Sequence, residues 1–270
     1  TGVKGGAEQD ADEWWAAMCS TTRTVFDKMP NIKKEQVEGI SFCSAMQGLV
    51  LVDKEGKCIR RPMTYMDQRA REELKKGMAH GVQIAGAEVT KLLKYLKYTG
   101  AVSSSVKDPI WKYRWVEAHE PENFKKISKI MLPKDYLAYK MTGVHCTDVS
   151  DASGMLLFDV KNRCWSKEML DICGIDENCM AKVFESYECV GNLTKEAAQR
   201  MGLTENVKVI AGAGDNAAAA VGTGTVGDGK CNISLGTSGT IFISSDKFGV
   251  DDNNAPVSYT HLTLPTNREV

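Results

Sequence analysis

Apolar and polar positions follow two periods along the chain, which predicts helices and strands in turn. Capping residues, charged first turns and apolar residues at helical spacing predict helices over 10–26, 70–78, 89–96, the segment after Asp108–Pro109, and 132–143. Short apolar and β-branched runs predict strands over 37–44, 48–53 paired with Cys58, and 207–212. Helices and strands mixed in this way indicate an α/β fold with mixed sheets.

The segment 212–240 carries the candidate chemistry. It contains Gly-Ala-Gly-Asp-Asn at 212–216, an alanine-rich run, and Ser-Leu-Gly-Thr-Ser-Gly-Thr at 234–240. Glycines let backbone N–H groups approach phosphate oxygens, and Thr237 and Ser238 add hydroxyl donors. Asp215 follows a predicted strand end and can accept the proton of an attacking alcohol. The pattern predicts phosphoryl transfer from a nucleotide to a sugar hydroxyl.

Two further glycine motifs overlap this segment. Residues 222–227 match the dinucleotide fingerprint, but a helix-favouring run precedes them where a strand is required. Residues 224–230 match most of a Walker A phosphate loop, but Cys231 stands where Ser or Thr would hold magnesium. A turn into a new strand is the favoured interpretation of both. A dinucleotide-dependent enzyme remains an alternative and requires a strand before Gly222.

Composition excludes several classes of protein. The net charge is −1 over 270 residues, with no basic block, so we expect neither nucleic acid nor a membrane as a partner. No apolar run approaches the roughly 18 residues of a membrane span. The nine cysteines form no C-x-x-C pair, and the four histidines are far apart, so we expect reduced thiols and no zinc site. These features predict a soluble, cytoplasmic protein.

Several short motifs occur in an order that is typical of one family. They are His119-Glu-Pro-Glu, Leu132-Pro-Lys-Asp-Tyr-Leu, Ser150-Asp-Ala-Ser-Gly, Gly214-Asp-Asn-Ala and Ser234-Leu-Gly-Thr-Ser-Gly. Each is weak alone, but their order and spacing are specific. Over about residues 8–250 the chain resembles the FGGY carbohydrate kinases, and among them the xylulose kinases.

The resemblance implies an actin-like ATPase fold with two ribonuclease-H-like domains around a cleft. The sugar-binding N-terminal domain would cover 1–225, and 226–255 would begin the nucleotide-binding domain. The resemblance makes Asp215 the catalytic base, directed at Mg²⁺ as well as at the sugar. Asn216 would hydrogen-bond the sugar, and the second phosphate loop would comprise Gly236, Thr237, Ser238 and Gly239. ATP and Mg²⁺ are the implied cofactors, and a homodimer is compatible with the intact enzyme.

The sugar pocket departs from the family pattern. Met46 and Gln47 align with a Met-His pair that contacts the sugar, so Gln replaces His here. The usual Trp-Asn/Gln-Asp motif appears as Tyr65-Met66-Asp67. Met46 can instead be a core residue, and Asp67 can instead serve a salt bridge or a cap. An unpaired polar group costs about 1–3 kcal/mol, so these changes leave the sugar open: D-xylulose or another ketose or polyol.

The ends of the chain lead to two further expectations. The family's first phosphate hairpin and most of its second domain are not represented, which suggests an incomplete and inactive piece of a kinase. Residues 256–270 show no helical or strand period and are expected to be a non-native tail. A non-catalytic sugar-binding protein on the same fold is the alternative function.

Overall fold

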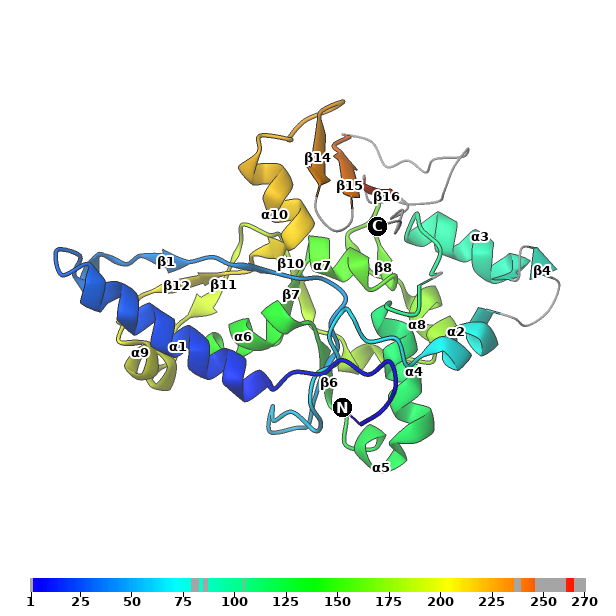
Figure 1. Cartoon of the computed structure of the whole chain (residues 1–270), viewed down its shortest axis with the longest axis horizontal. Coiled ribbons are helices and arrows are strands. Elements are labelled where there is room, and N and C mark those ends of the chain that lie inside the picture. The colour runs from blue at the N-terminus through cyan, green and yellow to red at the C-terminus, as the bar shows by residue number, and fades with distance from the viewer. Residues whose placement is uncertain are drawn as a thin grey trace, which may run out of the picture.

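Short strands from distant parts of the chain pair to organise the fold (Figure 1). β1 (Gly39–Ile40) runs parallel to β12 (Lys208–Ile210), whose other edge pairs antiparallel with β11 (Cys189–Asn192). The predicted α/β class with mixed sheets is therefore confirmed. The computed structural model describes residues 2–78, 83–84, 87–103, 105–235, 239–245 and 261–264.

The predicted helices all form, with bounds close to those expected. The helices are α1 (Ala11–Lys28), α2 (Arg71–Met78), α3 (Val89–Tyr98), α4 (Pro109–His119), α5 (Pro121–Phe124), α6 (Pro133–Thr142), α7 (Val149–Gly154), α8 (Lys167–Cys173), α9 (Lys195–Met201) and α10 (Asp215–Gly222). Asp10 caps α1 by accepting a hydrogen bond from the backbone N–H of Asp12 at 2.9 Å. Gly143 ends α6 in the left-handed conformation, with φ of 74°.

The remaining strands form small sheets, most of them two-stranded. They are β2 (Cys43–Ser44), β3 (Val50–Val52), β4 (Gln83–Ile84), β5 (Ala87–Glu88), β6 (Lys129–Met131), β7 (Cys146–Asp148), β8 (Phe158–Asp159), β9 (Cys164–Trp165), β10 (Lys182–Phe184), β13 (Ala213–Gly214), β14 (Cys231–Leu235), β15 (Gly239–Ile243) and β16 (His261–Leu264). β2 pairs parallel with β13, and β7 pairs parallel with β10. These two parallel pairs carry the candidate site.

One hydrophobic core lies between the β1–β12–β11 sheet and the helices α1, α6 and α9 (Figure 1). Its central side chains include Trp15, Met141 and Val209, each 2% exposed or less. A second core joins β3 and β6 to the helices α2, α3, α4 and α8 around Leu51 and Trp111. Burying large apolar side chains contributes about 1.5–3 kcal/mol each, so these cores hold the short strands in place.

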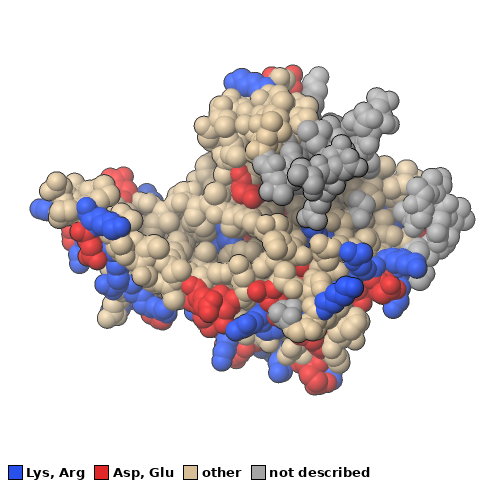
Figure 2. Space-filling model, viewed as in Figure 1, with Lys and Arg blue, Asp and Glu red and all other residues tan. Residues whose placement is uncertain are grey.

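Charged side chains are spread over the outer surface. On the face shown in Figure 2, Lys and Arg alternate with Asp and Glu along the lower body, and the surface around α10 is mostly uncharged. Within the part of the chain that the structure describes, no helix is both long and apolar enough to cross a bilayer.

Three local expectations need correction. The single strand expected over 37–44 is two short strands, because the chain leaves β1 before it pairs with β13 through β2. In the hairpin expected over 48–58, Cys58 makes one isolated bridge to Val52, and the ladder partner of β3 is β6. In the segment expected to have no strand period, β16 pairs antiparallel with β15.

Candidate active site

Asp215 lies where a strand meets a helix. β12 runs into the turn at Gly212, β13 follows, and Asp215 is the first residue of α10, with Gly214 as the N-cap. A strand leads to this carboxylate as predicted, but it is not a fully buried one: of the three residues of β12 only Val209 is buried. Asp215 is exposed, and its Oδ1 accepts a hydrogen bond from the backbone N–H of Asn216 at 2.9 Å. A carboxylate in the first turn is stabilised by the helix dipole.

Close backbone packing explains the glycines of this turn. Gly212 has φ of +72°, and a Cβ there would lie 2.1 Å from the carbonyl oxygen of Phe42. Only glycine satisfies both constraints. At Gly214 a Cβ would lie 2.7 Å from Cγ of Met46. The side chain of Met46 therefore packs directly against the residue that precedes Asp215.

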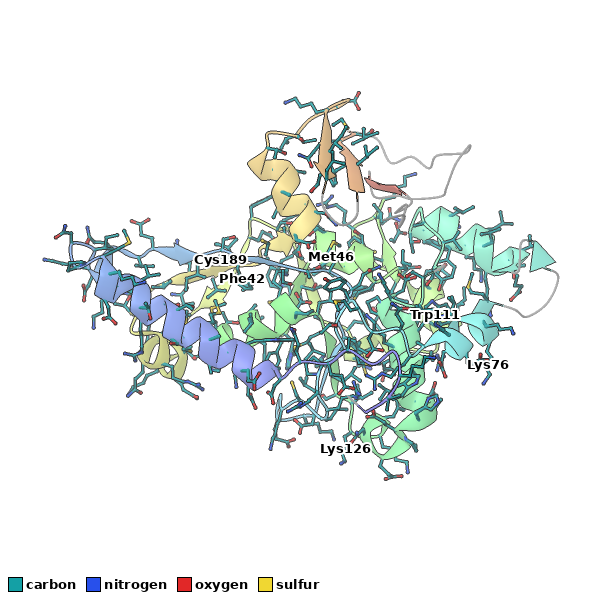
Figure 3. All side chains as sticks on the ribbon, in the orientation of Figure 1. Phe42, Met46, Lys76, Trp111, Lys126 and Cys189 are labelled. Carbon is teal, nitrogen blue, oxygen red and sulfur yellow. The ribbon has the colours of Figure 1, made fainter. Side chains whose placement is uncertain are left out.

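The pairing of β2 with β13 brings Met46, a predicted sugar-binding residue, close to Asp215, the predicted base. Gly214 of β13 is opposite Ser44 of β2, two residues before Met46. Figure 3 shows Met46 beneath the lower end of α10, with Phe42 farther along the same segment. Met46, Asp215 and Asn216 thus lie on adjoining segments.

Gln47 is held by a buried network that the sequence did not predict. Its backbone has φ of 65°, which is uncommon for a residue other than glycine. Its Nε2 donates to Oδ1 of Asp108 at 3.0 Å, and its carbonyl accepts from Nζ of Lys112 at 2.6 Å. Asp108 was expected to cap α4, but its carboxylate turns away, with Oδ2 accepting from Ser103 Oγ at 2.7 Å.

Burial shifts the acid–base properties of this network. Desolvation raises the pKa of Asp108 to about 6, despite the hydrogen bonds from Ser103 and the backbone of Ser105. Desolvation also lowers the pKa of Lys112 to about 8, against the attraction of Asp67 and Asp108. Lys112 lies four residues after Asp108 on the predicted helix, and nothing in the sequence pattern indicated that it would be buried in this network.

Asp67 is fully buried, and both of its oxygens accept hydrogen bonds. Oδ2 accepts from the backbone N–H of Ala7 at 2.9 Å, and Arg69 reaches both oxygens. Burial raises the pKa of Asp67, but the hydrogen bonds from Arg69 and Ala7 outweigh it, so the pKa is lowered. This geometry matches the salt-bridge alternative; contact with a sugar stays a prediction.

A second buried network lies behind the Asp215 turn. Nζ of Lys134 is 2.9 Å from Oδ1 of Asp135, 3.1 Å from Oδ1 of Asp148 and 3.5 Å from Oδ2 of Asp151. Each of these side chains is 2% exposed or less. Burial raises the pKa of Asp151 well above its usual range, although Lys134 opposes the shift. In the sequence, the motif Leu132-Pro-Lys-Asp indicated the family. It did not predict that its Lys and Asp belong to a buried ion cluster.

The phosphate loop is only partly within the described residues. Gly236, Thr237 and Ser238 lie outside them. Gly239 begins β15 and pairs with Leu235, the last residue of β14. The antiparallel β14–β15 pair agrees with the expected hairpin, and the role of its loop stays a prediction.

The competing motifs at 222–230 find no support. α10 ends at Gly222, so a helix rather than a strand precedes the apparent dinucleotide fingerprint. β14 follows at Cys231, where a Walker A loop would open a helix. The expected turn into a new strand is confirmed, and the dinucleotide alternative loses the strand that it requires.

Over the described ranges, no group of three His, Cys, Asp or Glu side chains is arranged to hold a metal ion.

A cavity of about 280 Å³ lies between α2, α3 and α4, lined by Lys76 and Trp111 among others. Figure 3 shows these two residues on the right of the molecule, away from Met46. The candidate chemistry is therefore not in this cavity.

Comparison with known proteins places this geometry in a family. The model of the FGGY family of carbohydrate kinases, N-terminal domain, matches residues 1–222. The xylulose kinase of Escherichia coli K12 is 34% identical over 258 residues, which cover 94% of this chain and 49% of that protein. The chain thus spans about half the length of the curated relatives that it matches.

Solved structures agree with this assignment. A protein from Brucella ovis, described as a xyloylose kinase, superimposes with a TM-score of 0.81 at 31% identity, over 92% of this chain and 48% of that one. A gluconate kinase from Lactobacillus acidophilus gives 0.80 at 23% identity, over 97% and 51%, which shows the fold alone. The expected actin-like ATPase fold is confirmed. The chain belongs to the FGGY family of carbohydrate kinases.

Proposed function

We propose that the protein containing this chain transfers the γ-phosphoryl group of ATP to a sugar hydroxyl, with Asp215 as general base. D-xylulose is the proposed acceptor, and a related ketose or polyol is the alternative acceptor. The single observation that carries the proposal is the position of Asp215. It is an exposed carboxylate on a glycine turn, beside Met46, in a chain of the FGGY family.

The other carboxylates near this segment are buried. Asp67 binds Arg69, Asp148 is 3.1 Å from Lys134, and Asp151 is 3.5 Å from Lys134 without a hydrogen bond to either oxygen among the described residues. A general base must reach the proton that it removes. Asp215 is the carboxylate of this group that meets that requirement.

The proposed step is an in-line displacement at phosphorus. The sugar oxygen forms a bond to the γ-phosphorus, the bond from that phosphorus to the β,γ-bridging oxygen breaks, and ADP leaves with the bond's electron pair. The hydroxyl proton passes to Oδ of Asp215. Positioning and charge stabilisation do most of the catalysis in such reactions, and a base adds about 10²–10⁴-fold.

The hydrogen bond from Gln47 to Asp108 indicates which side-chain atom of Gln47 is available to the sugar. The ionised carboxylate of Asp108 can only accept, so the amide nitrogen of Gln47 faces it. Oε1 is then the part of the amide that remains to accept from a sugar hydroxyl. We propose that Met46, Gln47 and Asn216 contact the sugar, while Asp67 contributes by holding the adjacent Tyr65–Met66 segment.

ATP and Mg²⁺ complete the proposal. Magnesium is usually held by one or two carboxylates together with substrate phosphates, and the exposed carboxylate of Asp215 fits that mode. Mg²⁺ would stabilise negative charge on the phosphates. Gly236, Thr237, Ser238 and Gly239 are proposed to bind phosphate, with the second domain beginning near residue 226. The match of the family model to 1–222 supports that boundary.

A non-catalytic sugar-binding protein is the second candidate, favoured by the replacement of the family's His by Gln47. One experiment separates the two. In the full-length protein encoded around this chain, ADP release is measured with D-xylulose, other ketoses and polyols, and Asp215→Ala is compared with wild type. We expect turnover to fall at least about 10²-fold with little change in melting temperature. Sugar binding without ADP release by wild type would support the binding protein, and near-normal turnover of Asp215→Ala would reject the base.

A further inference from the structure

The backbone that carries Asp215 is anchored at two points to the buried cluster behind it. The carbonyl of Ala211 accepts a hydrogen bond from Nζ of Lys134 at 3.1 Å. The N–H of Gly214 donates to Oγ of Ser150 at 2.9 Å. These contacts flank the turn at Gly212, so both ends of the segment that leads into Asp215 are fixed by side chains.

The hydroxyl of Ser150, which is the second anchor, is oriented by Asp148 of the buried cluster. Oγ of Ser150 donates to Oδ2 of Asp148 at 2.6 Å, which leaves its lone pairs to accept from Gly214. Oδ2 of Asp148 also accepts from Oγ of Ser186 at 2.7 Å, and its Oδ1 faces Lys134 at 3.1 Å. An ion pair followed by two hydrogen bonds therefore links the buried ammonium of Lys134 to the peptide N–H of Gly214, just before Asp215.

The packing leaves this turn little freedom to move. A Cβ at Gly214 would lie 3.2 Å from Oδ1 of Asp151, and one at Gly212 would lie 3.3 Å from Cδ of Lys134. The cluster thus leaves little room for a side chain at either glycine of the turn. Buried hydrogen bonds in a polar network favour one arrangement, and those from Lys134 and Ser150 reach the turn directly, although neither oxygen of Asp151 is hydrogen-bonded within the described residues.

We propose that Ser150 and Lys134 are positioning residues for Asp215: they set the direction of the carboxylate by fixing the Gly214 N–H and the Ala211 carbonyl. This inference rests on the proposed function of Asp215 as general base. It goes further by assigning a catalytic consequence to Lys134, which is buried away from the substrate, and to the half-buried Ser150. Lys134 is 1% exposed, and its ammonium faces three carboxyl groups.

Ser150→Ala in the full-length protein is the direct test, because it removes the acceptor of the Gly214 N–H and leaves the ion cluster in place. Displacement of a catalytic group by about 1 Å can cost about 10²-fold in rate. We expect kcat to fall about 10–100-fold, with KM for the sugar within about threefold of wild type. Ser150→Thr keeps the hydroxyl and is expected to restore kcat.

Ser186→Ala is the matched control. It removes the other hydroxyl that donates to the same oxygen of Asp148 but leaves the Gly214 hydrogen bond intact. If Ser150→Ala and Ser186→Ala have equal kcat, or if Ser150→Thr does not restore the rate, the positioning role is wrong. A purely structural role would lower the melting temperature of both variants alike.

Two parallel measurements keep this inference separable from the proposed function. If Asp215→Ala keeps its turnover, the base assignment fails; if it loses turnover while Ser150→Ala does not, only the positioning role fails. Hydrogen exchange of the Gly214 amide needs no activity. We expect it to speed up at least about tenfold in Ser150→Ala and to stay unchanged in Ser186→Ala. Unchanged exchange in both variants would overturn the anchor itself.

Discussion

At the scale of single residues, the candidate site depends on where each carboxyl group finds its partners. From the sequence, Asp215 was the candidate base, Asp108 was a helix cap, and Asp67 and Asp151 were either pocket residues or structural salt bridges and caps. The structure separates them, because three are buried against cations or amides and Asp215 is exposed. Distances between segments far apart in the chain decide this, and local sequence does not contain them.

The burial of Asp108 predicts a pH-dependent stability. Its folded-state pKa is raised to about 6 from 3.8. The folded protein therefore holds a proton that the unfolded chain has lost, so this group's contribution falls as pH rises from about 4 to about 6. At 1.36 kcal/mol per unit the loss is about 2–3 kcal/mol. The substitution Asp108→Asn removes this pH-dependent contribution to stability.

Urea unfolding of wild type and Asp108→Asn at several pH values between 4 and 7 measures this contribution. The difference in free energy of unfolding between variant and wild type should change by about 2–3 kcal/mol in favour of Asn as pH rises. Asp171→Asn, at an exposed ion pair with Lys167, is the control and should show no such trend. A flat difference for Asp108→Asn would contradict the assigned burial effect.

At the scale of elements, the segments were predicted well and their pairing was not. Helical spacing, the Asp10 cap and the Gly143 stop gave α1 and α6 within a few residues. The strands are only two to five residues long, too short for a period-2 pattern to show partner or register. The parallel pairing of β2 with β13, which brings Met46 to the Asp215 turn, is therefore a result of the tertiary structure.

The turn between β12 and β13 should tolerate no side chain at Gly212. Gly212→Ala would place a Cβ 2.1 Å from the Phe42 carbonyl oxygen and force a positive φ on alanine. We expect a loss of at least about 1–3 kcal/mol in the free energy of unfolding from the backbone alone. Gly222→Ala, with nothing within 4 Å of the added Cβ, should be neutral or stabilising. Equal stability of the two variants would show that the turn can relax.

At the scale of the whole molecule, a charged network joins the N-terminal segment to the second core. The guanidinium of Arg69 binds Asp67 and Glu8 and lies 4.3 Å from the centre of the Trp115 ring. Arg60 bridges Glu8 and Glu120. No sequence motif predicted the ion pairs of Arg60 with Glu8 and Glu120 or of Arg69 with Glu8, because each links positions more than fifty residues apart.

Removing Arg69 should loosen this junction. Arg69→Met leaves Asp67 buried without its cation, which we expect to cost about 3–5 kcal/mol in the free energy of unfolding. Arg61→Met removes an exposed arginine 3.8 Å from Asp10 and should change stability by less than about 1 kcal/mol. Denaturant unfolding of both variants measures the difference. A loss below about 1 kcal/mol for Arg69→Met would mean that Arg60 holds the segment alone.

The family and its fold could be predicted from the sequence because ordered short motifs survive where overall identity is only about one third. The sugar could not, because one changed side chain in a polar pocket alters which hydroxyls are bound. A gluconate kinase shares the fold, so the fold does not decide the acceptor.

The central claim is that Asp215 serves phosphoryl transfer to a sugar. The most direct measurement is ³¹P nuclear magnetic resonance of the full-length protein incubated with ATP, Mg²⁺ and D-xylulose. The account predicts a new phosphomonoester signal that grows with ADP and is absent when Asp215→Ala replaces wild type. Signals of ADP and inorganic phosphate alone, or an ester formed equally by the Asp215→Ala variant, would contradict it.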